Sequence, residues 1–336
     1  MLSRYSRQVV YNRIGEKGQK TLLDSHAVII GVGALGTVIA NNLARAGVGK
    51  LTIIDRDFVE LSNLQRQTLF TEEDVKNNLP KAEAAVRHLK EINSEIQLEA
   101  VVADFNATNA EKLIRDVDII LDGTDNFSTR FLINDVALKH KKPWVYGGAV
   151  ADTGMVMNII PGVTPCFRCL IQDPPVSGHT QTCDTVGVLN STTGIIGNIQ
   201  AVEAIKILLK SEAVLKGVLT INIWQTEFDK FEIEQDKKCP ACQQGKYEFL
   251  NNRTPATTLL CGQNSIQVLP QQNRDISLPE MANRLQKLGE VEYNRFLLRF
   301  KTDQYTITVF PDGRAIVSGT ENPGKARSLY AQYIGN

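Results

Sequence analysis

The sequence lacks the features that would place a protein in a membrane, on nucleic acid or outside the cell. No apolar run approaches the roughly 18 residues that a membrane-spanning helix needs. The 37 basic residues equal the 37 acidic ones, so no net field attracts nucleic acid or a membrane surface. Residues 1–20 alternate charge and polarity without an apolar core and do not predict a signal peptide. We therefore expect a cytoplasmic protein with no membrane or nucleic-acid partner.

Cysteine is also scarce, with six in 336 residues, and four of the six stand in two Cys-x-x-Cys pairs. A disulfide-stapled secreted scaffold carries cysteine far more densely. A redox dithiol would account for one pair, but no thioredoxin-like βαβ context surrounds either of them. Four thiolates form the ligand set of a closed tetrahedral Zn²⁺ site. The pattern favours a structural zinc site formed by Cys166, Cys169, Cys239 and Cys242.

Residues 27–55 predict a βαβ unit, with apolar strands at 27–31 and 51–55 around a helix at 35–46. Near-continuous apolar strands are typical of parallel sheets buried on both faces. Helices and strands keep alternating up to residue 146, which favours a doubly wound, mostly parallel α/β sheet. The further helices are expected at 81–91, 110–115 and 129–140, and the further strands at 96–101, 118–121 and 143–146.

After Gly148 the pattern becomes extended and rich in loops. We expect an extended segment at 154–160, a functional loop at 161–187, a helix at 197–210, and strands at 219–224 and 230–233. These elements close a first domain of residues 1–248. Residues 255–336 predict a small α+β domain with a strand at 265–269, a capped helix at 278–288 and a hairpin at 305–317. It carries no catalytic motif, and its Cys261 reads as structural.

The loop Gly31-Val-Gly33-Ala34-Leu-Gly36 follows the first strand and opens the first helix. Its glycines permit a tight turn, close approach of backbone N–H groups to a phosphate, and close packing of the helix on the strand. Asp55 ends the second strand, where a carboxylate accepts hydrogen bonds from ribose hydroxyls. The loop indicates a nucleotide, and it leaves both NAD and ATP open.

Two cations downstream favour ATP, because a triphosphate attacked at its α-phosphorus needs positive charge along its phosphates. Arg66 lies in the uncharged stretch Asn63-Leu-Gln-Arg-Gln67, and Lys81 follows Pro80. Lys81 also fits a surface lysine at a helix start. We expect the pair to bind phosphates.

Asp125, after the apolar strand at 118–121, sits where doubly wound sheets place ligand groups and is a candidate Mg²⁺ ligand. The alternative is a helix N-cap, a role that Asp122 or Asn126 fills equally well.

Cys183 lies in the loop-rich segment, away from both cysteine pairs, and is either a nucleophile that reacts as the thiolate or an inert thiol. Arg4-Tyr-Ser-Arg7-Gln8 looks, by composition, like a disordered basic leader.

Taken together, these motifs resemble the ThiF/MoeB family of ubiquitin-activating-like adenylyltransferases. The resemblance covers about residues 3–245. It rests on Arg4-Tyr5-x-Arg7-Gln8, Gly31-x-Gly33-x-x-Gly36, Asp55, Ser62 to Gln67, Pro80-Lys81, Thr124-Asp125-Asn126, Thr182-Cys183 and both cysteine pairs. Members of this family adenylylate the terminal Gly-Gly carboxylate of a sulfur-carrier protein with Mg-ATP, for thiamin thiazole or molybdopterin synthesis.

The resemblance implies a role for each matching residue. Asp55 would hold the ribose, Asn63, Arg66 and Lys81 the phosphates, and Asp125 the Mg²⁺. Arg7 would reach the partner subunit's site in a homodimer, and Cys183 matches the position where some members link covalently to the carrier. The implied nucleotide-binding set is Gly31, Gly33, Ala34, Gly36, Asp55, Asn63, Arg66, Lys81, Asp125 and Asn126.

One departure concerns the sulfur supply, since residues 255–336 contain no rhodanese-like cysteine loop. Sulfur would then come from another protein, such as a cysteine desulfurase. Three other readings stay open. The first is a NAD-dependent Rossmann dehydrogenase, which leaves the cations and the cysteine pairs unexplained. The second is an inactive half of a heterodimeric activating enzyme, but such proteins tend to lose the phosphate cations. The third is a tRNA-modifying dehydratase of the same fold, which generally lacks the zinc cysteines.

Overall fold

The computed structural model describes residues 3–175, 183–251, 257–260, 264–270 and 276–335. The chain forms two compact units, Met1–Arg253 and Thr254–Asn336. They are called the large unit and the small unit below.

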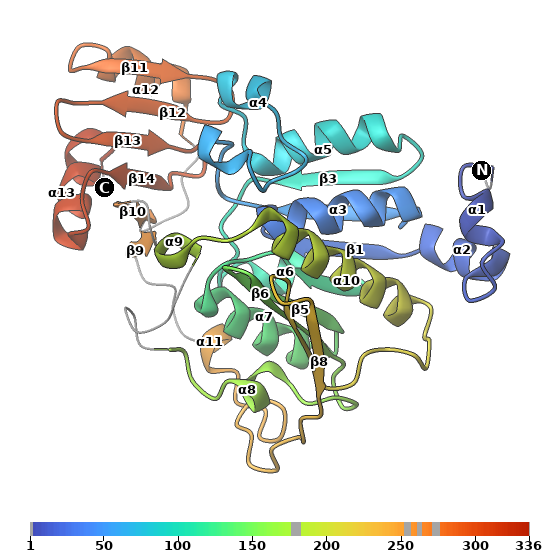
Figure 1. Ribbon diagram of the computed structural model, residues 1–336. Helices are drawn as coiled ribbons and strands as arrows, with labels where there is room; N and C mark the ends of the chain where they lie inside the picture. Colours follow the sequence, from blue (N-terminus) through green and yellow to red (C-terminus); the bar gives the residue numbers. More distant parts are fainter. Residues whose placement is uncertain (1–2, 176–182, 252–256, 261–263, 271–275, 336) are drawn as a thin grey trace. The chain divides into compact units, whose positions relative to one another are not determined.

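The large unit is built on one mixed sheet of eight described strands (Figure 1). In spatial order these are β3 (Gln97–Val101), β2 (Lys50–Ile54), β1 (His26–Ile30), β4 (Ile119–Asp122), β5 (Trp144–Val150), β6 (Thr153–Ile159), β7 (Val218–Asn222) and β8 (Glu227–Phe231). Strands β3 to β5 pair in parallel, and β5 to β8 pair antiparallel. The chain leaves β1 for β2 on one side and later returns to β4 on the other. Ligands of open α/β sheets bind at such a switch point.

Helices cover both faces of this sheet (Figure 1). Helices α3 (Ala34–Ala46), α5 (Lys81–Ile92) and α10 (Asn190–Leu208) pack on one face, and α6 (Ala110–Leu113) and α7 (Phe127–Lys139) pack on the other. Successive residues of a strand point to opposite faces, so a central strand that is covered on both faces is mainly apolar. The predicted doubly wound α/β fold is confirmed.

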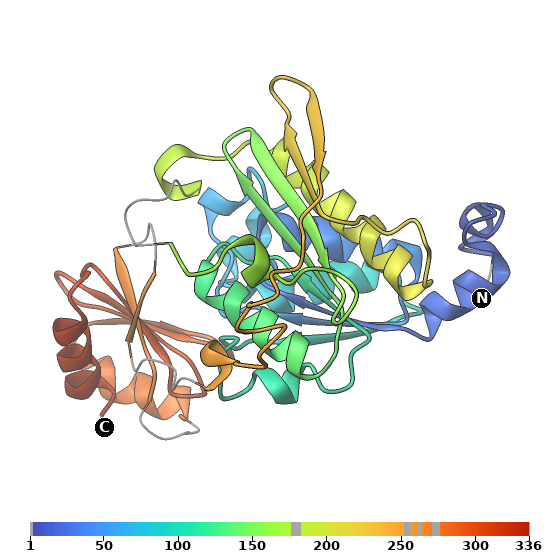
Figure 2. The same ribbon diagram turned by 90° about the horizontal axis from the view of Figure 1, so that it is seen from below.

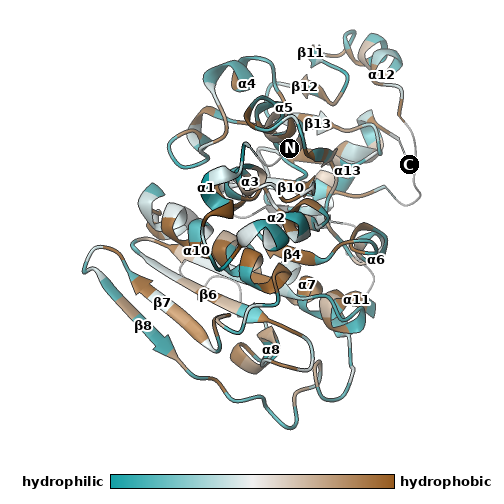
Figure 3. Ribbon diagram, turned by 90° about the vertical axis from the view of Figure 1, so that its right-hand side faces the viewer, coloured by the Kyte–Doolittle hydropathy of each residue, from teal (hydrophilic) through white to brown (hydrophobic). Residues whose placement is uncertain are grey.

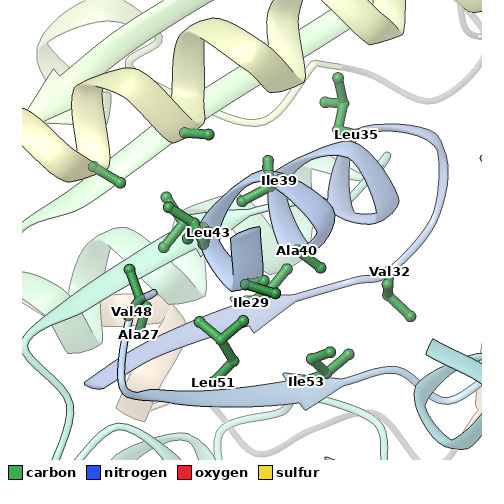
Figure 4. Packing of buried hydrophobic residues seen from close by; sticks show 14 of the residues in the cluster. Ala27, Ile29, Val32, Leu35, Ile39, Ala40, Leu43, Val48, Leu51 and Ile53 are labelled. Atoms are coloured by element: carbon green, nitrogen blue, oxygen red, sulfur yellow. The ribbon is translucent and has the colours of Figure 1, made fainter. Parts of the chain in front are cut away.

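Helix α3 shows how the glycine loop is anchored (Figure 4). Leu35, Ile39 and Leu43 recur every four residues and so lie on one face of the helix. They pack with Ile29 of β1 and Leu51 of β2, and all five side chains are 5% exposed or less. Burial of each such side chain contributes about 1.5 to 3 kcal/mol to stability, so the amino end of α3 is held firmly at the carboxyl ends of the strands.

The other helices of the large unit are short or peripheral. They are α1 (Ser6–Val9), α2 (Gly15–Leu23), the 3₁₀ helix η1 (Leu61–Asn63), α4 (Glu72–Lys76), α8 (Phe167–Leu170), α9 (Cys183–Val186) and α11 (Glu248–Asn251). The outermost strand β8 is exposed along its whole length, whereas β7 beside it is largely buried. In Figure 3, coloured by hydropathy, β7 is mostly brown, whereas β8 carries both teal and brown.

The amino-terminal segment is not a disordered leader, which corrects the impression given by its composition. Tyr5 is 2% exposed, and its hydroxyl accepts a hydrogen bond from Asn93 Nδ2 at 2.8 Å. Gln8 donates to the carbonyl of Ala46 at 2.8 Å. These contacts fix α1 at the carboxyl end of α3.

Two helices begin earlier in the chain than predicted. Helix α7 begins at Phe127 because Asn126 caps it, and α10 begins at Asn190, seven residues before the predicted start at Gly197. Gly197 lies inside α10, where an added Cβ would come 2.8 Å from Cβ of Val38 on α3. The glycine is therefore a close-packing residue at a helix crossing and not a helix boundary.

The small unit is an antiparallel sheet of six described strands covered by two helices (Figure 2). Its order is β11 (Glu290–Tyr293), β12 (Leu298–Lys301), β13 (Thr306–Val309), β14 (Ala315–Ser318), β10 (Ser265–Val268) and β9 (Thr257–Leu260), with α12 (Leu278–Leu285) and α13 (Pro323–Tyr333). Both helices share one hydrophobic core with the sheet, so they cover the same face. Cys261 lies outside the described residues.

Among the described helices, none has both the length and the apolar composition needed to cross a membrane.

Candidate active site and metal centre

A cavity of about 540 Å³ lies at the carboxyl ends of the parallel strands. Residues that follow β3, β2, β1 and β4 line one part of it, and residues of β5 to β8 line the rest. Eight of the predicted nucleotide-binding or catalytic residues line it: Gly31, Gly33, Ala34, Asp55, Arg66, Lys81, Asp125 and Asn126. Gly36, Asn63 and Arg7 do not line it.

The three glycines of the loop have different tasks. Gly31 has a φ of +83°, and a Cβ there would lie 2.8 Å from the carbonyl oxygen of Gly123. A Cβ on Gly36 would lie 2.1 Å from the carbonyl oxygen of Gly31. A Cβ on Gly33 would meet nothing nearer than 3.7 Å. Gly31 and Gly36 thus serve close packing, and Gly33 leaves open space on the cavity side.

The amino end of α3 faces the cavity through Gly33 and Ala34. No described side chain caps this helix, and its first turn holds no acidic residue. The first backbone N–H groups of a helix lack intrahelical partners, and the helix dipole adds partial positive charge there. The arrangement is a ready site for a phosphate or carboxylate group.

Asp55 is held rigidly at the end of β2. Its Oδ2 accepts a hydrogen bond from the backbone N–H of Val32 at 2.7 Å, and its Oδ1 accepts one from Asp57 N–H at 2.8 Å. The side chain is 9% exposed, and burial raises the pKa of its carboxyl against the opposing effect of Lys81. Each oxygen keeps a second lone pair, so the carboxylate can still accept from a sugar hydroxyl.

Lys81 is a buried cation at the first position of α5. Its Nζ lies 3.4 Å from Asp57 Oδ2, and the residue is 8% exposed. Burial alone lowers the pKa of Lys81, but Asp57, Asp55 and Asp125 together outweigh it and raise the pKa. The ammonium group is therefore charged at neutral pH and lines the cavity.

Arg66 reaches the cavity from the loop after η1, and its Nη1 donates to the carbonyl of Ser62 at 3.1 Å. Asn63, the last residue of η1, is 8% exposed, and its Oδ1 accepts from Glu60 N–H at 3.1 Å. This bond is half of a capping box around η1. Asn63 thus shapes the loop that carries Arg66.

The sequence left open which residue caps helix α7 and whether Asp125 is available for a ligand. Asn126 Oδ1 accepts from the backbone N–H of Thr129 at 2.8 Å and is the N-cap of α7. Asp125 is exposed at the cavity wall and makes no hydrogen bond to any described residue. Its carboxylate remains available for a ligand or a metal ion.

Several charged or polar residues of the site escaped the sequence analysis. Arg130 of α7 is 7% exposed, and its Nε donates to Asp122 Oδ2 at 3.0 Å. Arg56 pairs with Asp104 at 2.8 Å, and Tyr146 lines the cavity from β5. A signal existed for Arg130, since this cation directly precedes the apolar residues Phe131, Leu132 and Ile133 of its helix, at the end nearest Asp125.

Arg7 lies at the wrong end of the unit to act in this cavity. It is exposed on α1, which packs at the carboxyl end of α3, whereas the cavity lies at the amino end. The thirteen residues of α3 span about 20 Å. Cys183 begins α9, and its side chain lies outside the described part of the structure.

The four paired cysteines meet in one cluster, and none of them lines the cavity. Their sulfur atoms all lie within 4.8 Å of one another, with Cys166 to Cys239 at 3.6 Å and Cys169 to Cys242 at 3.6 Å. A tetrahedral Zn²⁺ with bonds of about 2.3 Å places its sulfur ligands about 3.8 Å apart. All four cysteines are free of disulfides. Type and geometry of the donors fit zinc, and an ion there would join the segment after β6 to the segment after β8.

Comparisons with known proteins identify the family of the chain. The ThiF family model matches residues 5–241. The sulfur carrier protein ThiS adenylyltransferase of Bacillus subtilis is 41% identical over 342 aligned positions, covering all of both chains. The sulfur carrier protein adenylyltransferase of Thermus thermophilus is 35% identical over 247 positions, which are 72% of this chain and 90% of that protein.

Among solved structures, E. coli MccB with AMPCPP and MccA superposes with a TM-score of 0.62 and 26% identity, over 71% of this chain and 74% of that one. The dehydrogenase reading is therefore not borne out, and the adenylyltransferase reading is confirmed. The chain belongs to the ThiF family and is an adenylyltransferase.

Proposed function

We propose that this enzyme uses ATP to adenylylate the carboxyl-terminal glycine of a ubiquitin-like sulfur-carrier protein of the ThiS type. The observation that carries the proposal is the asymmetry of the cavity. One part holds the uncapped end of α3 with Arg66 and Lys81, and in the other part the strands β5 to β8 contribute one charged side chain, Asp229. The first part suits a triphosphate, and the second suits a slender tail without charged side chains, such as Gly-Gly.

The nucleotide is assigned to the part of the cavity near β1 and β2. Asp55 accepts from the ribose hydroxyls, and the amino end of α3 receives a phosphate group. Arg66 and Lys81 balance the remaining negative charge. Asn63 supports this set indirectly, by holding the loop of Arg66.

Asp125 is assigned to Mg²⁺. Magnesium prefers carboxylate oxygens, phosphate oxygens and water, and it takes only one or two protein carboxylates in such sites. Asp125 fits because it lines the cavity and has no other hydrogen-bond partner among the described residues. Bound there, the ion would neutralise charge on the triphosphate.

The chemistry needs positioning more than acid or base catalysis. A carboxylate oxygen of the carrier attacks the α-phosphorus, the bond to the β-phosphate oxygen breaks, and pyrophosphate leaves with the electron pair. The attacking carboxylate is ionised at neutral pH, so no general base is required. Arg66, Lys81 and the α3 terminus stabilise the charge that moves onto pyrophosphate.

The ThiS type is favoured over a MoaD type by the extent of the similarity. The Bacillus subtilis ThiS adenylyltransferase matches this chain over its whole length, small unit included. The archaeal SAMP-activating enzyme of Haloferax volcanii matches 75% of it, and the Thermus protein matches 72%. We assign the small unit, on this ground, to contacts with the carrier or with the sulfur donor.

A homodimer is part of the proposal, because Arg7 cannot reach the cavity of its own chain. Tyr5 and Gln8 fix α1 so that Arg7 stays exposed. We assign Arg7 to the phosphates bound by the second subunit.

The later sulfur step is assigned to Cys183 and to an external donor such as a cysteine desulfurase. Cys183 begins α9, and Val188, five residues on, lines the cavity. The Cys183 thiolate would displace AMP from the adenylated carrier to form a thioester, or would take sulfane sulfur from a persulfide on the donor and release the donor's thiolate.

The four clustered cysteines form a candidate metal site and no disulfide, so the enzyme is assigned to the reducing cytoplasm.

The test is carrier-dependent exchange of label between pyrophosphate and ATP. The purified enzyme is offered a ThiS-type carrier and a MoaD-type carrier separately, each beside a version that lacks the last glycine. Exchange with the intact ThiS-type carrier alone supports the proposal. Exchange with the MoaD type alone reassigns the pathway, and no exchange with either, despite bound ATP, points to another carboxylate or a tRNA base.

A further inference from the structure

The order of the strands along the cavity determines the order in which the groups of the substrates can lie there. The wall is built successively from segments at β3, β2, β1, β4, β5, β6, β7 and β8. Neighbouring strands lie about 4.8 Å apart. If the ribose lies at β2 and the phosphates at β1 and β4, the attacking group must come from β5. This step rests on the proposed function.

Tyr146 is the polar side chain that β5 contributes to this part of the cavity wall. It is 5% exposed, and its ring is fixed by neighbours, with Phe167 at 4.9 Å between ring centroids and the Arg130 guanidinium 5.1 Å from the centroid. Trp144 lies at 6.3 Å on the same strand. The position of the phenol is therefore set before any substrate binds.

The hydroxyl of Tyr146 has no hydrogen-bond partner among the described residues. An added Cβ on Gly148 would lie 2.7 Å from it, and both residues line the cavity. The absence of a side chain at Gly148 thus makes room for the hydroxyl. Burial raises the pKa of the phenol, so the group is a donor at neutral pH.

Arg130 supports the same spot with a buried positive charge. Its Nε is bound to Asp122, and its Nη2 donates to the carbonyls of Thr124 at 2.7 Å and Gly147 at 3.1 Å. Its Nη1 has no acceptor among the described residues, and Arg130 lines the cavity. A phenol and a guanidinium next to each other form a donor pair that suits a carboxylate.

We infer that Tyr146, backed by Arg130, binds the carboxylate of the carrier's Gly-Gly tail beside the α-phosphate. The phenol donates to one carboxylate oxygen and leaves the other free to attack phosphorus. When the new C–O–P linkage forms and pyrophosphate departs, the same hydrogen bond falls on the acyl carbonyl oxygen. Tyr146 keeps its proton throughout, so no proton has to be supplied or removed.

The experiment uses a ThiS-type carrier in two forms, one ending in the Gly-Gly carboxylate and one ending in the Gly-Gly carboxamide. Wild-type enzyme, Tyr146→Phe and the control Tyr330→Phe are compared. Tyr330 is also a buried tyrosine, whose hydroxyl donates to Gly313, and it does not line the cavity. Carrier affinity is measured by titration with ATP analogue present, and kcat/KM by pyrophosphate exchange.

A hydrogen bond to a charged group corresponds to about a 10- to 100-fold change. We expect Tyr146→Phe to lose about that factor in kcat/KM for the carboxylate form, with ATP-analogue affinity and melting temperature unchanged. Wild-type enzyme prefers the carboxylate form to the carboxamide form, and in Tyr146→Phe that preference shrinks. Tyr330→Phe keeps it.

An unchanged preference in Tyr146→Phe overturns the inference while leaving the proposed function standing. Absence of exchange in the wild-type enzyme itself defeats the proposed function, which is a separable result. Gly148→Ala is a second variant, since its Cβ displaces the hydroxyl without altering the tyrosine. It should reproduce the loss of Tyr146→Phe, and wild-type behaviour of Gly148→Ala contradicts the inference.

Discussion

Asn93 donates from Nδ2 both to the hydroxyl of Tyr5, at 2.8 Å, and to the carbonyl of Ala44 near the end of α3, at 2.7 Å. Asn93 is 1% exposed and lies 88 residues from Tyr5 in the chain. One amide group therefore joins the amino-terminal arm to the helix whose other end faces the cavity.

This junction predicts that Asn93→Ala frees α1. Two buried acceptors lose their donor, which costs about 1 to 3 kcal/mol. Pyrophosphate exchange and ATP affinity should both fall, because Arg7 is no longer presented to the phosphates bound by the second subunit. Hydrogen exchange of residues 4–10 checks the release of the arm. Glu95→Ala is the matched control, because it removes only an exposed ion pair with Arg4.

Arg66→Ala should abolish adenylate formation without affecting the fold. The side chain has one hydrogen bond, to a carbonyl of its own loop, and it lines the cavity. Loss of one cation from the departing pyrophosphate corresponds to about 10²- to 10³-fold in rate. Lys90→Ala, which removes an exposed cation outside the cavity on α5, should retain wild-type exchange. Normal pyrophosphate release by Arg66→Ala would refute the assignment.

Two alanine substitutions in the glycine loop should separate binding from stability. Gly33→Ala has no neighbour nearer than 3.7 Å, so the protein should fold normally and lose ATP affinity. Gly36→Ala places a methyl group 2.1 Å from a carbonyl oxygen, and the free energy of unfolding should drop by about 1 to 3 kcal/mol. Urea unfolding and nucleotide titration on both variants check the contrast, which fails if Gly33→Ala is the less stable of the two.

Removal of zinc should destabilise the large unit and leave the cavity residues in place. Stripping with a chelator, or Cys239→Ser, should lower the melting temperature by at least about 5 °C, since each kcal/mol corresponds to about 2 to 4 °C in a unit of this size. Metal analysis should give one zinc per chain in the wild-type protein and in Cys183→Ser, because Cys166, Cys169, Cys239 and Cys242 already supply four ligands. An unchanged melting temperature after complete removal of zinc would exclude a structural role.

Asp135 should make stability depend on pH. It is fully buried on α7, accepts from the backbone N–H of Phe249 at 2.8 Å, and burial raises its pKa to about 6. Against 3.8 in the unfolded chain, ionisation in the folded protein costs about 3 kcal/mol.

The sign follows from the raised pKa of Asp135. The native state binds the proton more tightly, so this contribution is fully present below pH 4 and is lost as the pH rises through 6. Asp135→Asn keeps an acceptor for Phe249 and cannot ionise. Unfolding free energies at pH 4.5 and 7.5 should differ less in Asp135→Asn than in wild type. An equal difference in both proteins would show that Asp135 is not the titrating group.

Local patterns allowed the parallel half of the sheet, the glycine loop and the cysteine cluster to be predicted. The residues Ala27 to Ile30 are apolar on both faces of their strand, which predicts a buried parallel strand. The ligands of a zinc site can be recognised from residue type and spacing. The small unit was foreseen for similar reasons, since its hairpin carries its own turn residues.

What escaped prediction depends on contacts between distant parts of the chain. Tyr5 looks like part of a basic leader until Asn93 is placed beside it. Gly197 resembles a helix boundary until Val38 is seen against it. Tyr146 reads as an ordinary aromatic of a buried strand, and only the space above Gly148 reveals that its hydroxyl has a free position in the cavity wall.

The change from parallel to antiparallel pairing at β5 also bears on how such an enzyme diversifies. The half that we assign to the nucleotide depends on crossover helices and on glycines such as Gly36 and Gly123, where an added Cβ would lie 2.1 Å from the carbonyl oxygen of Gly31, so few substitutions are tolerated there. The acceptor half is a series of neighbouring antiparallel strands ending in an exposed edge, where residues can be exchanged or inserted without disturbing the other half. Selection can therefore change which protein is activated while the activation chemistry stays fixed.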